Sequence, residues 1–193
     1  MTGGPQRVLV FGGSFNPVHW GHLAMAEFVR EEWGYDLVLL VPVSRSPFKD
    51  GRADPGPQER LSMLQLACAD NPCFRVDDRE LRRGGTSFTI DTIRELVEEG
   101  WVAGRPGLLL GDDLVGDFPK WRECEALARE AEIIVARRSG LAVDASFPCK
   151  ISANRVIPVS SSEIRERIKS GRSIRYLVPE TVRLHIAEGG LYA

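Results

Sequence analysis

The sequence has 193 residues, 43% of them hydrophobic, which suits one medium-sized domain that buries a full apolar core. Its 25 Lys and Arg residues nearly balance its 27 Asp and Glu residues, so we expect neither a nucleic-acid surface nor a membrane-binding face. No apolar run reaches the ~20 residues of a membrane span or resembles the core of a signal peptide, which indicates a cytoplasmic protein. The cysteines lack metal-binding spacing and predict reduced, mostly buried thiols at Cys68, Cys73, Cys124 and Cys149.

The first element lies in the stretch from Arg7 to His22, R-V-L-V-F-G-G-S-F-N-P-V-H-W-G-H. Its apolar run from Val8 to Phe11 predicts a strand, and the glycines and proline that follow predict a tight loop. Gly12 and Gly13 have no Cβ, so the backbone N–H groups of this loop can approach a phosphate closely. The alternative is that the glycine pair simply makes a turn.

Helix-forming sequence follows from about Gly21. The start of a helix carries unpaired N–H groups and roughly +0.5 of a charge, which favours an anion at the same loop. His19 and His22 have the spacing of side chains on one helix face, so both imidazoles can face the loop. A capping or core role is the alternative for either histidine alone. Neither a P-loop pattern nor G-x-G-x-x-G is present, which argues against a kinase or a dehydrogenase.

The stretch G-G-S-F-N-P-V-H-W-G-H-L resembles the G-x-F-[DN]-P-x-H-x-G-H loop of the HxGH nucleotidyltransferases. This superfamily includes phosphopantetheine, glycerol-phosphate and nicotinate mononucleotide adenylyl- or cytidylyltransferases. The resemblance implies that His19 and His22 are the signature histidines and that Ser14 and Phe15 contact both substrates. The implied ATP contacts in this loop are Gly12, Gly13, Ser14, Phe15, His19 and His22.

A helix and a second strand follow. Apolar residues at helical spacing continue to Val29, and Gly34 is suited to the position just after the helix end. Asp36 to Val43 is a nearly unbroken apolar run, typical of a parallel strand covered on both faces. Two strands and a connecting helix make a βαβ unit, for which we expect a right-handed crossover.

Ser44 to Pro57 is a polar loop rich in proline and glycine, with Arg45, Lys49 and Arg52 just after a strand end. Open α/β sheets bind ligands at this edge, although a solvated, mobile loop is the alternative. The nicotinate mononucleotide branch of the superfamily commonly carries P-H-K here. Lys49 matches its phosphate-binding lysine, whereas Phe48 stands in place of the usual histidine.

The middle of the chain alternates between helices and short strands. Pro57 suits a helix start, Cys73 to Val76 predicts a short strand, and Arg79 to Gly85 predicts a basic turn. The next helix ends near Gly100 and is marked by apolar residues at helical spacing, Ile90, Ile93, Leu96 and Val97.

The stretch T-S-F-T-I-D-T-I opens that helix. Ordinary helix-start chemistry explains its hydroxyl residues. It also resembles the [ST]-Y-T-x-D-T-L of the nicotinate mononucleotide branch, which implies a pyridine-nucleotide subsite at Ser87, Phe88, Thr89 and Thr92, with Phe88 in place of Tyr. We expect the backbone around Ser87 to Thr89 to bind the pyridine substituent.

Gly107 to Gly111 predicts a buried strand, followed by the acidic pair Asp112 and Asp113. The pair could bind ribose or Mg²⁺, or cap the next helix. The family carries G-x-D followed by Trp, which implies that Gly111 and Asp113 contact the mononucleotide and that Trp121 stacks on the pyridine. A core-filling role is the alternative for Trp121.

Glu132 to Arg137 predicts the next strand, and R-R-S-G resembles the family's R-x-G turn, which makes Arg138 a candidate ligand of the mononucleotide phosphate. Leu141 to Asn154 shows no periodicity and predicts a loop whose role the sequence does not indicate. Arg155 to Val159 predicts a short terminal strand.

The following helix opens with a capping box, Ser160 as cap and Glu163 three residues later. Arg165 falls on its second turn, where we expect a free guanidinium. The family has I-S-S-T-x-I-R here, which implies that Ser161, Ser162 and Arg165 hold the ATP β- and γ-phosphates. The final G-R-S-I-R-Y-L-V-P…L-Y resembles the C-terminal signature of the nicotinate mononucleotide branch and favours that substrate class.

These elements predict a doubly wound, Rossmann-like α/β sheet over residues 1–193, with a small helical portion from about residue 160. The resemblance implies AMP transfer from ATP to nicotinate mononucleotide in NAD biosynthesis, with Mg²⁺ bound through the ATP phosphates. Its implied catalytic residues are His19, His22, Lys49 and Arg165.

Several alternatives stay open. They are a nicotinamide mononucleotide or dual-specificity enzyme, a phosphopantetheine adenylyltransferase, and a catalytically silent nucleotide-binding regulator. We expect small-molecule partners rather than nucleic acid or membrane, and the sequence leaves open whether the chain forms a homo-oligomer.

Overall fold

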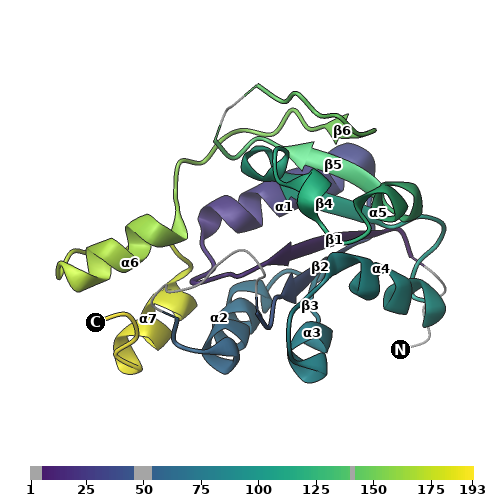
Figure 1. Ribbon diagram of the computed structural model, residues 1–193. Helices are drawn as coiled ribbons and strands as arrows, with labels where there is room; N and C mark the ends of the chain where they lie inside the picture. Colours follow the sequence, from purple (N-terminus) through teal and green to yellow (C-terminus); the bar gives the residue numbers. More distant parts are fainter. Residues whose placement is uncertain (1–5, 46–53, 140–141) are drawn as a thin grey trace.

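The computed structural model describes residues 6–45, 54–139 and 142–193. Within these ranges it has a six-stranded, all-parallel sheet in the order β3-β2-β1-β4-β5-β6 (Figure 1). The chain starts near the middle of the sheet, builds one half and then crosses back to build the other, which confirms the predicted doubly wound fold. The strands are β1 (Val8–Gly13), β2 (Leu37–Pro42), β3 (Phe74–Val76), β4 (Gly107–Gly111), β5 (Glu132–Ala136) and β6 (Lys150–Ile151).

Helices cover both faces of the sheet. Alternate residues of each strand point to opposite faces, so Leu9 and Phe11 pack on one apolar cluster and Val8 and Val10 on another. The first cluster is covered by α1 (Trp20–Trp33), α2 (Pro57–Cys68), α6 (Ser161–Lys169) and α7 (Glu180–Glu188). The second is covered by α4 (Thr89–Glu98) and α5 (Cys124–Glu130).

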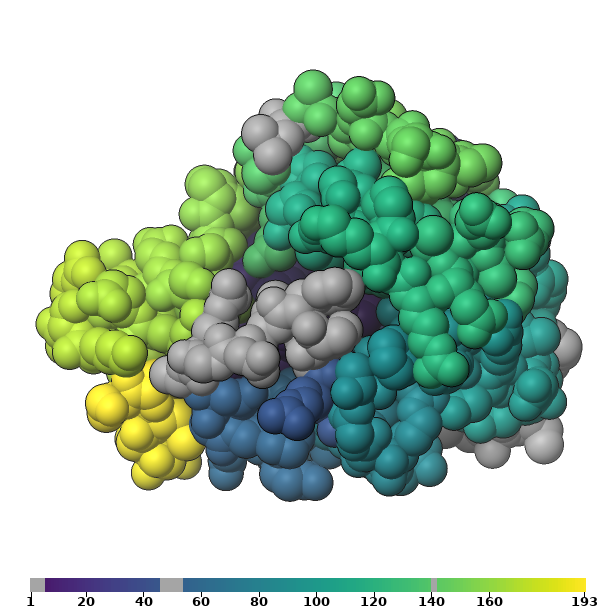
Figure 2. All heavy atoms as spheres, in the orientation of Figure 1, coloured from purple at the N-terminus to yellow at the C-terminus, as the bar shows by residue number. Residues whose placement is uncertain are grey.

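The C-terminal helices complete the first of these layers. In Figure 2, α6 and α7 form the projection at the lower left, with α7 beside α2. Ile164 of α6 and Val182 and Ile186 of α7 are buried in the same cluster as the residues of α1 and α2. The predicted helical C-terminal portion therefore shares the main apolar core.

Several helix ends lie where the sequence predicts them. Gly34 follows α1 with a φ of +64°, and its N–H bonds to the carbonyls of Arg30 and Glu31. This left-handed conformation suits glycine, as expected for a helix C-terminus. Pro57 occupies the first turn of α2, and Ser160 caps α6 by accepting a hydrogen bond from the Glu163 N–H at 3.1 Å. Local sequence thus fixes these boundaries.

The strand predicted at Arg155 to Val159 is wrong. The last strand is β6, Lys150–Ile151, inside the stretch predicted as a loop, where it pairs with Ile134 and Val135 of β5. Beyond β6 the Asn154 side chain, in place of a strand backbone, binds the N–H and the carbonyl of Arg137 at 2.8 Å. A strand of two residues is too short to carry a periodic signal.

Two predictions between residues 79 and 100 also need correction. The basic turn is a short helix, α3 (Arg79–Arg83). In α4, Ile90, Ile93 and Leu96 are buried, but Val97 is 49% exposed, so the apolar stripe is narrower than predicted. One-turn 3₁₀ helices follow β4 at Asp112–Leu114 and Phe118–Lys120.

All four cysteines are unpaired, as expected, but only Cys68 is fully buried and the other three are partly exposed. Among the described residues, none of the helices combines the length and the apolar composition that crossing a bilayer requires.

Candidate active site

Two cavities open at the carboxyl edge of the sheet, where β1, β2 and β4 end. The first has a volume of about 340 Å³ and the second about 570 Å³. Both are lined by Gly12, Gly13 and Ser14 at the end of β1, so the two cavities meet there. The strand order reverses between β1 and β4, and ligands of open α/β sheets bind at this switch point.

The loop after β1 has an unusual backbone conformation. Phe15 has a φ of +46°, a left-handed value that is rare outside glycine. Its ring is buried and makes edge contacts with Phe11, centroids 5.4 Å apart, and with His22, centroids 5.2 Å apart. A Cβ on Gly13 would lie 3.0 Å from Cζ of Phe15, whereas one on Gly12 would meet nothing within 4 Å. Gly13 therefore makes room for the Phe15 ring, and Gly12 leaves the cavity wall open.

The two histidines stack on each other at the start of α1. Their ring centroids are 3.7 Å apart with planes inclined by 30°. His22 lines the first cavity, whereas His19 lies behind it, in a narrow space that Arg138 also lines. The His19 backbone N–H donates to His22 Nδ1 at 3.3 Å, so a neutral His22 ring carries its proton on Nε2. The predicted pair is thus brought together, but only His22 lines the first cavity.

His19 is neutral at neutral pH. Burial lowers its pKa to about 3, and the positive charge of Arg138 acts in the same direction. The sequence left the charge of both histidines open. For His19 the structure resolves it, because a buried imidazole beside an arginine does not hold a second positive charge.

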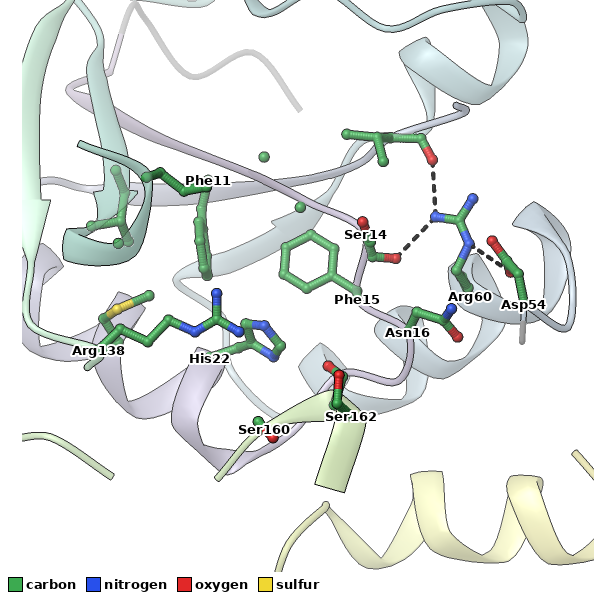
Figure 3. Close-up of a pocket in the computed structure, with 18 of the residues that line it drawn as sticks. Phe11, Ser14, Phe15, Asn16, His22, Asp54, Arg60, Arg138, Ser160 and Ser162 are labelled. Atoms are coloured by element: carbon green, nitrogen blue, oxygen red, sulfur yellow. Dashed lines mark hydrogen bonds and ion pairs between the residues drawn. The ribbon is translucent and has the colours of Figure 1, made fainter. Parts of the chain in front are cut away.

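Arg60 of α2 joins the ends of β1 and β2 and was not recognised from the sequence. Its guanidinium donates to the carbonyls of Ser14 and Val43 at 2.9 Å and of Ser44 at 3.2 Å, and pairs with Asp54 at 3.2 Å (Figure 3). Only 2% of the residue is exposed. In the sequence it stands among polar residues of an ordinary helix start, and no local pattern indicates that its partners lie on two other loops.

The first turns of α6 also face the first cavity, with Ser160, Ser161, Ser162 and Arg165 in its lining. The expectation of a free Arg165 guanidinium is wrong. Nη1 donates to the Asn16 carbonyl at 2.7 Å and Nη2 to Ser162 Oγ at 3.0 Å. Ser161 Oγ donates to the Pro17 carbonyl at 2.9 Å. Ser161 and Arg165 therefore hold the β1–α1 loop as well as lining the cavity.

The acidic pair after β4 has two separate structural roles. Asp112 is buried and accepts hydrogen bonds from the N–H and the hydroxyl of Ser139, both at 2.8 Å. Asp113 lines the second cavity and pairs at 3.0 Å with Arg138, which lines the first. Gly111 lines the first cavity, and a side chain there would collide with Asp113. The ion pair thus links the two cavities.

The second cavity contains the residues predicted for the pyridine nucleotide: Ser87, Phe88, Thr89, Thr92, Asp113 and Trp121. Ser87 Oγ accepts from the Ser44 N–H at 2.9 Å, which ties the loop after β2 to the start of α4. Trp121 lies 5.5 Å from Phe118, ring centroid to ring centroid, and its buried Nε1 has no hydrogen-bond partner within residues 6–45, 54–139 and 142–193. Trp121 therefore both packs against Phe118 and lines the second cavity.

The buried Thr92 hydroxyl is hydrogen-bonded to two charged residues. It donates to Glu80 at 2.7 Å and accepts from Arg83 at 3.1 Å, and only 1% of the residue is exposed. Glu80 also lines the second cavity, and burial raises the pKa of its carboxyl group. Lys49 and Phe48 lie outside the described residues, so the role of Lys49 stays a prediction.

Comparison with known proteins identifies the class. The sequence model of the cytidylyltransferase-like family matches residues 10–167. A solved Plasmodium falciparum nicotinic acid mononucleotide adenylyltransferase, complexed with NaAD, has the same fold with a TM-score of 0.78 at 20% identity, covering 96% of each chain. The chain is thus a cytidylyltransferase-like protein.

Curated relatives narrow this class. One from Roseiflexus sp. (strain RS-1) is 39% identical over the full length of both chains, and one from Treponema pallidum (strain Nichols) is 36% identical over 97% of this chain and 99% of its own. Both carry the name "Probable nicotinate-nucleotide adenylyltransferase". The chain belongs to the nicotinate-nucleotide adenylyltransferase family.

Proposed function

We propose that the protein transfers AMP from ATP to nicotinate mononucleotide, which gives nicotinate adenine dinucleotide and pyrophosphate. The observation that carries the proposal is that two cavities meet at Gly12 to Ser14. One is lined by His22 and the start of α6, and the other by Trp121 and the start of α4. Two nucleotides bound there would bring a nucleophilic phosphate and an α-phosphate together.

The first cavity suits the triphosphate. Helix α6 begins at this cavity, and its unpaired N–H groups and dipole favour an anion. Ser161 and Arg165 would exchange their bonds to the β1–α1 loop for bonds to phosphate oxygens, and Ser162 would exchange its bond from Arg165. Mg²⁺ would arrive with ATP as part of the substrate and share the phosphate oxygens with these side chains.

The second cavity suits the mononucleotide. Trp121 offers a ring for the pyridine to stack on, and aromatic pairs of this kind contribute about 0.5–1.5 kcal/mol beyond area burial. Helix α4 starts at Thr89 without a side-chain cap, so its first N–H groups favour the nicotinate carboxylate over the neutral amide of nicotinamide.

The reaction needs no protein nucleophile. An oxygen of the mononucleotide phosphate attacks the α-phosphorus of ATP, a new P–O bond forms, and the bond to the β-phosphate breaks with its electron pair leaving on pyrophosphate. Orientation of two bound reactants can lower the reaction barrier by roughly 7–11 kcal/mol. One general acid or base contributes less, since it raises the rate by only about 10²- to 10⁴-fold. Nε2–H of His22 would donate to the phosphate charge that develops, while neutral His19 supports the His22 ring from behind.

The test is pyrophosphate release with ATP and Mg²⁺, measured side by side with nicotinate and nicotinamide mononucleotide. A strong preference for the acid is the expected result. Equal rates would establish a dual-specificity enzyme instead. Tight ATP binding without pyrophosphate release in either reaction would favour the silent regulator.

The unpaired cysteines support the proposal that this reaction takes place in the cytoplasm.

His22→Ala provides a second test. We expect kcat to fall by about 10²- to 10³-fold, the cost of removing one donor to transition-state charge. His185→Ala is the matched control, because His185 of α7 pairs with Glu59 of α2 and lines neither cavity. Circular dichroism of both variants checks the fold. Near-normal turnover of a folded His22→Ala protein would contradict the role.

A further inference from the structure

The loop between β1 and α1 needs support from outside itself. Phe15 holds a left-handed φ of +46°, and such conformations persist in non-glycine residues only where surrounding contacts impose them. The loop leads directly to His22, so its conformation sets where the imidazole lies relative to the first cavity. Which contacts impose this conformation is therefore a question about catalysis as well as stability.

The described contacts reach the loop from both sides. Arg60 holds the Ser14 carbonyl from α2, and α6 holds the next carbonyls through Arg165 on Asn16 and Ser161 on Pro17. The side chains from α6 line the first cavity, where ATP would compete for the same donors. Their hold on the loop in the absence of ligand is thus expected to loosen when ATP binds.

Tyr192 makes a contact of a different kind. Its hydroxyl donates to Asn16 Oδ1 at 2.6 Å, across 176 residues of sequence. The residue is 8% exposed and lines neither of the two large cavities. Burial raises the pKa of its hydroxyl well above the ordinary value, so the group stays protonated and keeps donating. A bound nucleotide has no access to this donor.

We propose that Tyr192 is a positioning residue of the transferase site: its hydroxyl holds Asn16, and through Asn16 the loop that places His22, while ATP engages the side chains of α6. The inference rests on the proposed function. It predicts that removing the Tyr192 hydroxyl lowers turnover because Asn16 loses its partner, and not because Tyr192 contacts a ligand.

Tyr192→Phe removes the hydroxyl and keeps the ring. We expect kcat for pyrophosphate release to fall by about five- to tenfold, in line with the loss of one buried hydrogen bond, with the KM for nicotinate mononucleotide unchanged. Tyr176→Phe is the matched control, since Tyr176 belongs to the same C-terminal portion but is 85% exposed. It should match the wild type.

A double-mutant cycle separates positioning from general loss of structure. In an Asn16→Ala background, Tyr192→Phe should cause no further loss of kcat, because the acceptor is already gone. Asn16→Asp keeps an acceptor oxygen, so in that background Tyr192→Phe should again lower kcat. Full additivity of Tyr192→Phe and Asn16→Ala, or an unchanged kcat in Tyr192→Phe, would overturn the inference. Absence of pyrophosphate release from the wild type would instead overturn the proposed function.

Discussion

At the scale of single residues, His19 links stability to pH. Its folded pKa of about 3 lies below the ordinary value of 6.5, so between these values only the unfolded chain takes up a proton. The stabilisation is complete above pH 6.5 and is lost as the pH falls towards 3. The rate of loss is at most about 1.4 kcal/mol per pH unit.

The comparison that isolates this residue is His19→Gln, which cannot be protonated. When the pH is lowered from about 6.5 to 5, the free energy of urea unfolding should fall by about 2 kcal/mol more in the wild type than in the variant. Parallel pH dependence in the two proteins would show that His19 is not buried in its neutral form.

Arg60 gives a prediction in which stability and activity fall together. Arg60→Ala removes the donor that the carbonyls of Ser14, Val43 and Ser44 share, and each buried group left unpaired costs about 1–3 kcal/mol. We expect a loss of at least about 2 kcal/mol in the free energy of unfolding, with reduced pyrophosphate release. Arg60→Lys retains the charge but not the planar guanidinium, so it should recover only part of the stability and part of the pyrophosphate release. Wild-type turnover in Arg60→Ala would show that the loop does not depend on this anchor.

The grouping of candidate site residues was predictable from the sequence where these residues are neighbours in the chain. The glycines, Ser14 and the histidines fall within one short motif, and Ser161 to Arg165 fall within another. The partners of Arg60 and Tyr192 are Ser14 and Asn16, 46 and 176 residues away, and no local pattern records such pairs. The same limit explains the wrong expectation for Arg165, whose carbonyl partner is 149 residues away.

At the scale of elements, β4 depends on a glycine that no side chain can replace without displacing its neighbours. A Cβ on Gly107 would lie 2.5 Å from the Tyr35 hydroxyl oxygen and 2.9 Å from Leu9 Cδ1. Gly107→Ala should therefore destabilise the fold by about 1–3 kcal/mol, as overpacking does in other cores.

Gly116→Ala is the control for that substitution, because a Cβ there meets nothing within 4 Å. Thermal unfolding of both variants is the measurement. Equal melting temperatures would mean that the sheet accommodates a methyl group at the start of β4.

The strands covered on both faces were predictable because each is a continuous apolar run, and the helix ends were predictable because their capping residues are local. The edge strand β6 was not, since Lys150 and Ile151 carry no apolar run and pair only because β5 offers an edge. For α3 the sequence predicts a turn, because the five residues of this helix are mostly charged and carry no apolar periodicity.

At the scale of the whole molecule, the two cavities should report their ligands separately. Each substrate alone should stabilise the protein by about 2.7 kcal/mol at a concentration of 100 Kd. Trp121→Ala should weaken the stabilisation by nicotinate mononucleotide and leave that by ATP with Mg²⁺ unchanged, because Trp121 lines only the second cavity. Thermal shift with each ligand tests this. An equal loss for both ligands would contradict two distinct subsites.

The bond between Tyr192 and Asn16 has a consequence for protein synthesis. Tyr192 is made 176 residues after its partner Asn16, which takes about 9–35 s at about 5–20 residues per second. During that interval the β1–α1 loop lacks its distant anchor, and Arg165 of α6 is itself made 149 residues after Asn16. A growing chain thus contains both histidines well before it contains the side chains that anchor the loop between them and β1.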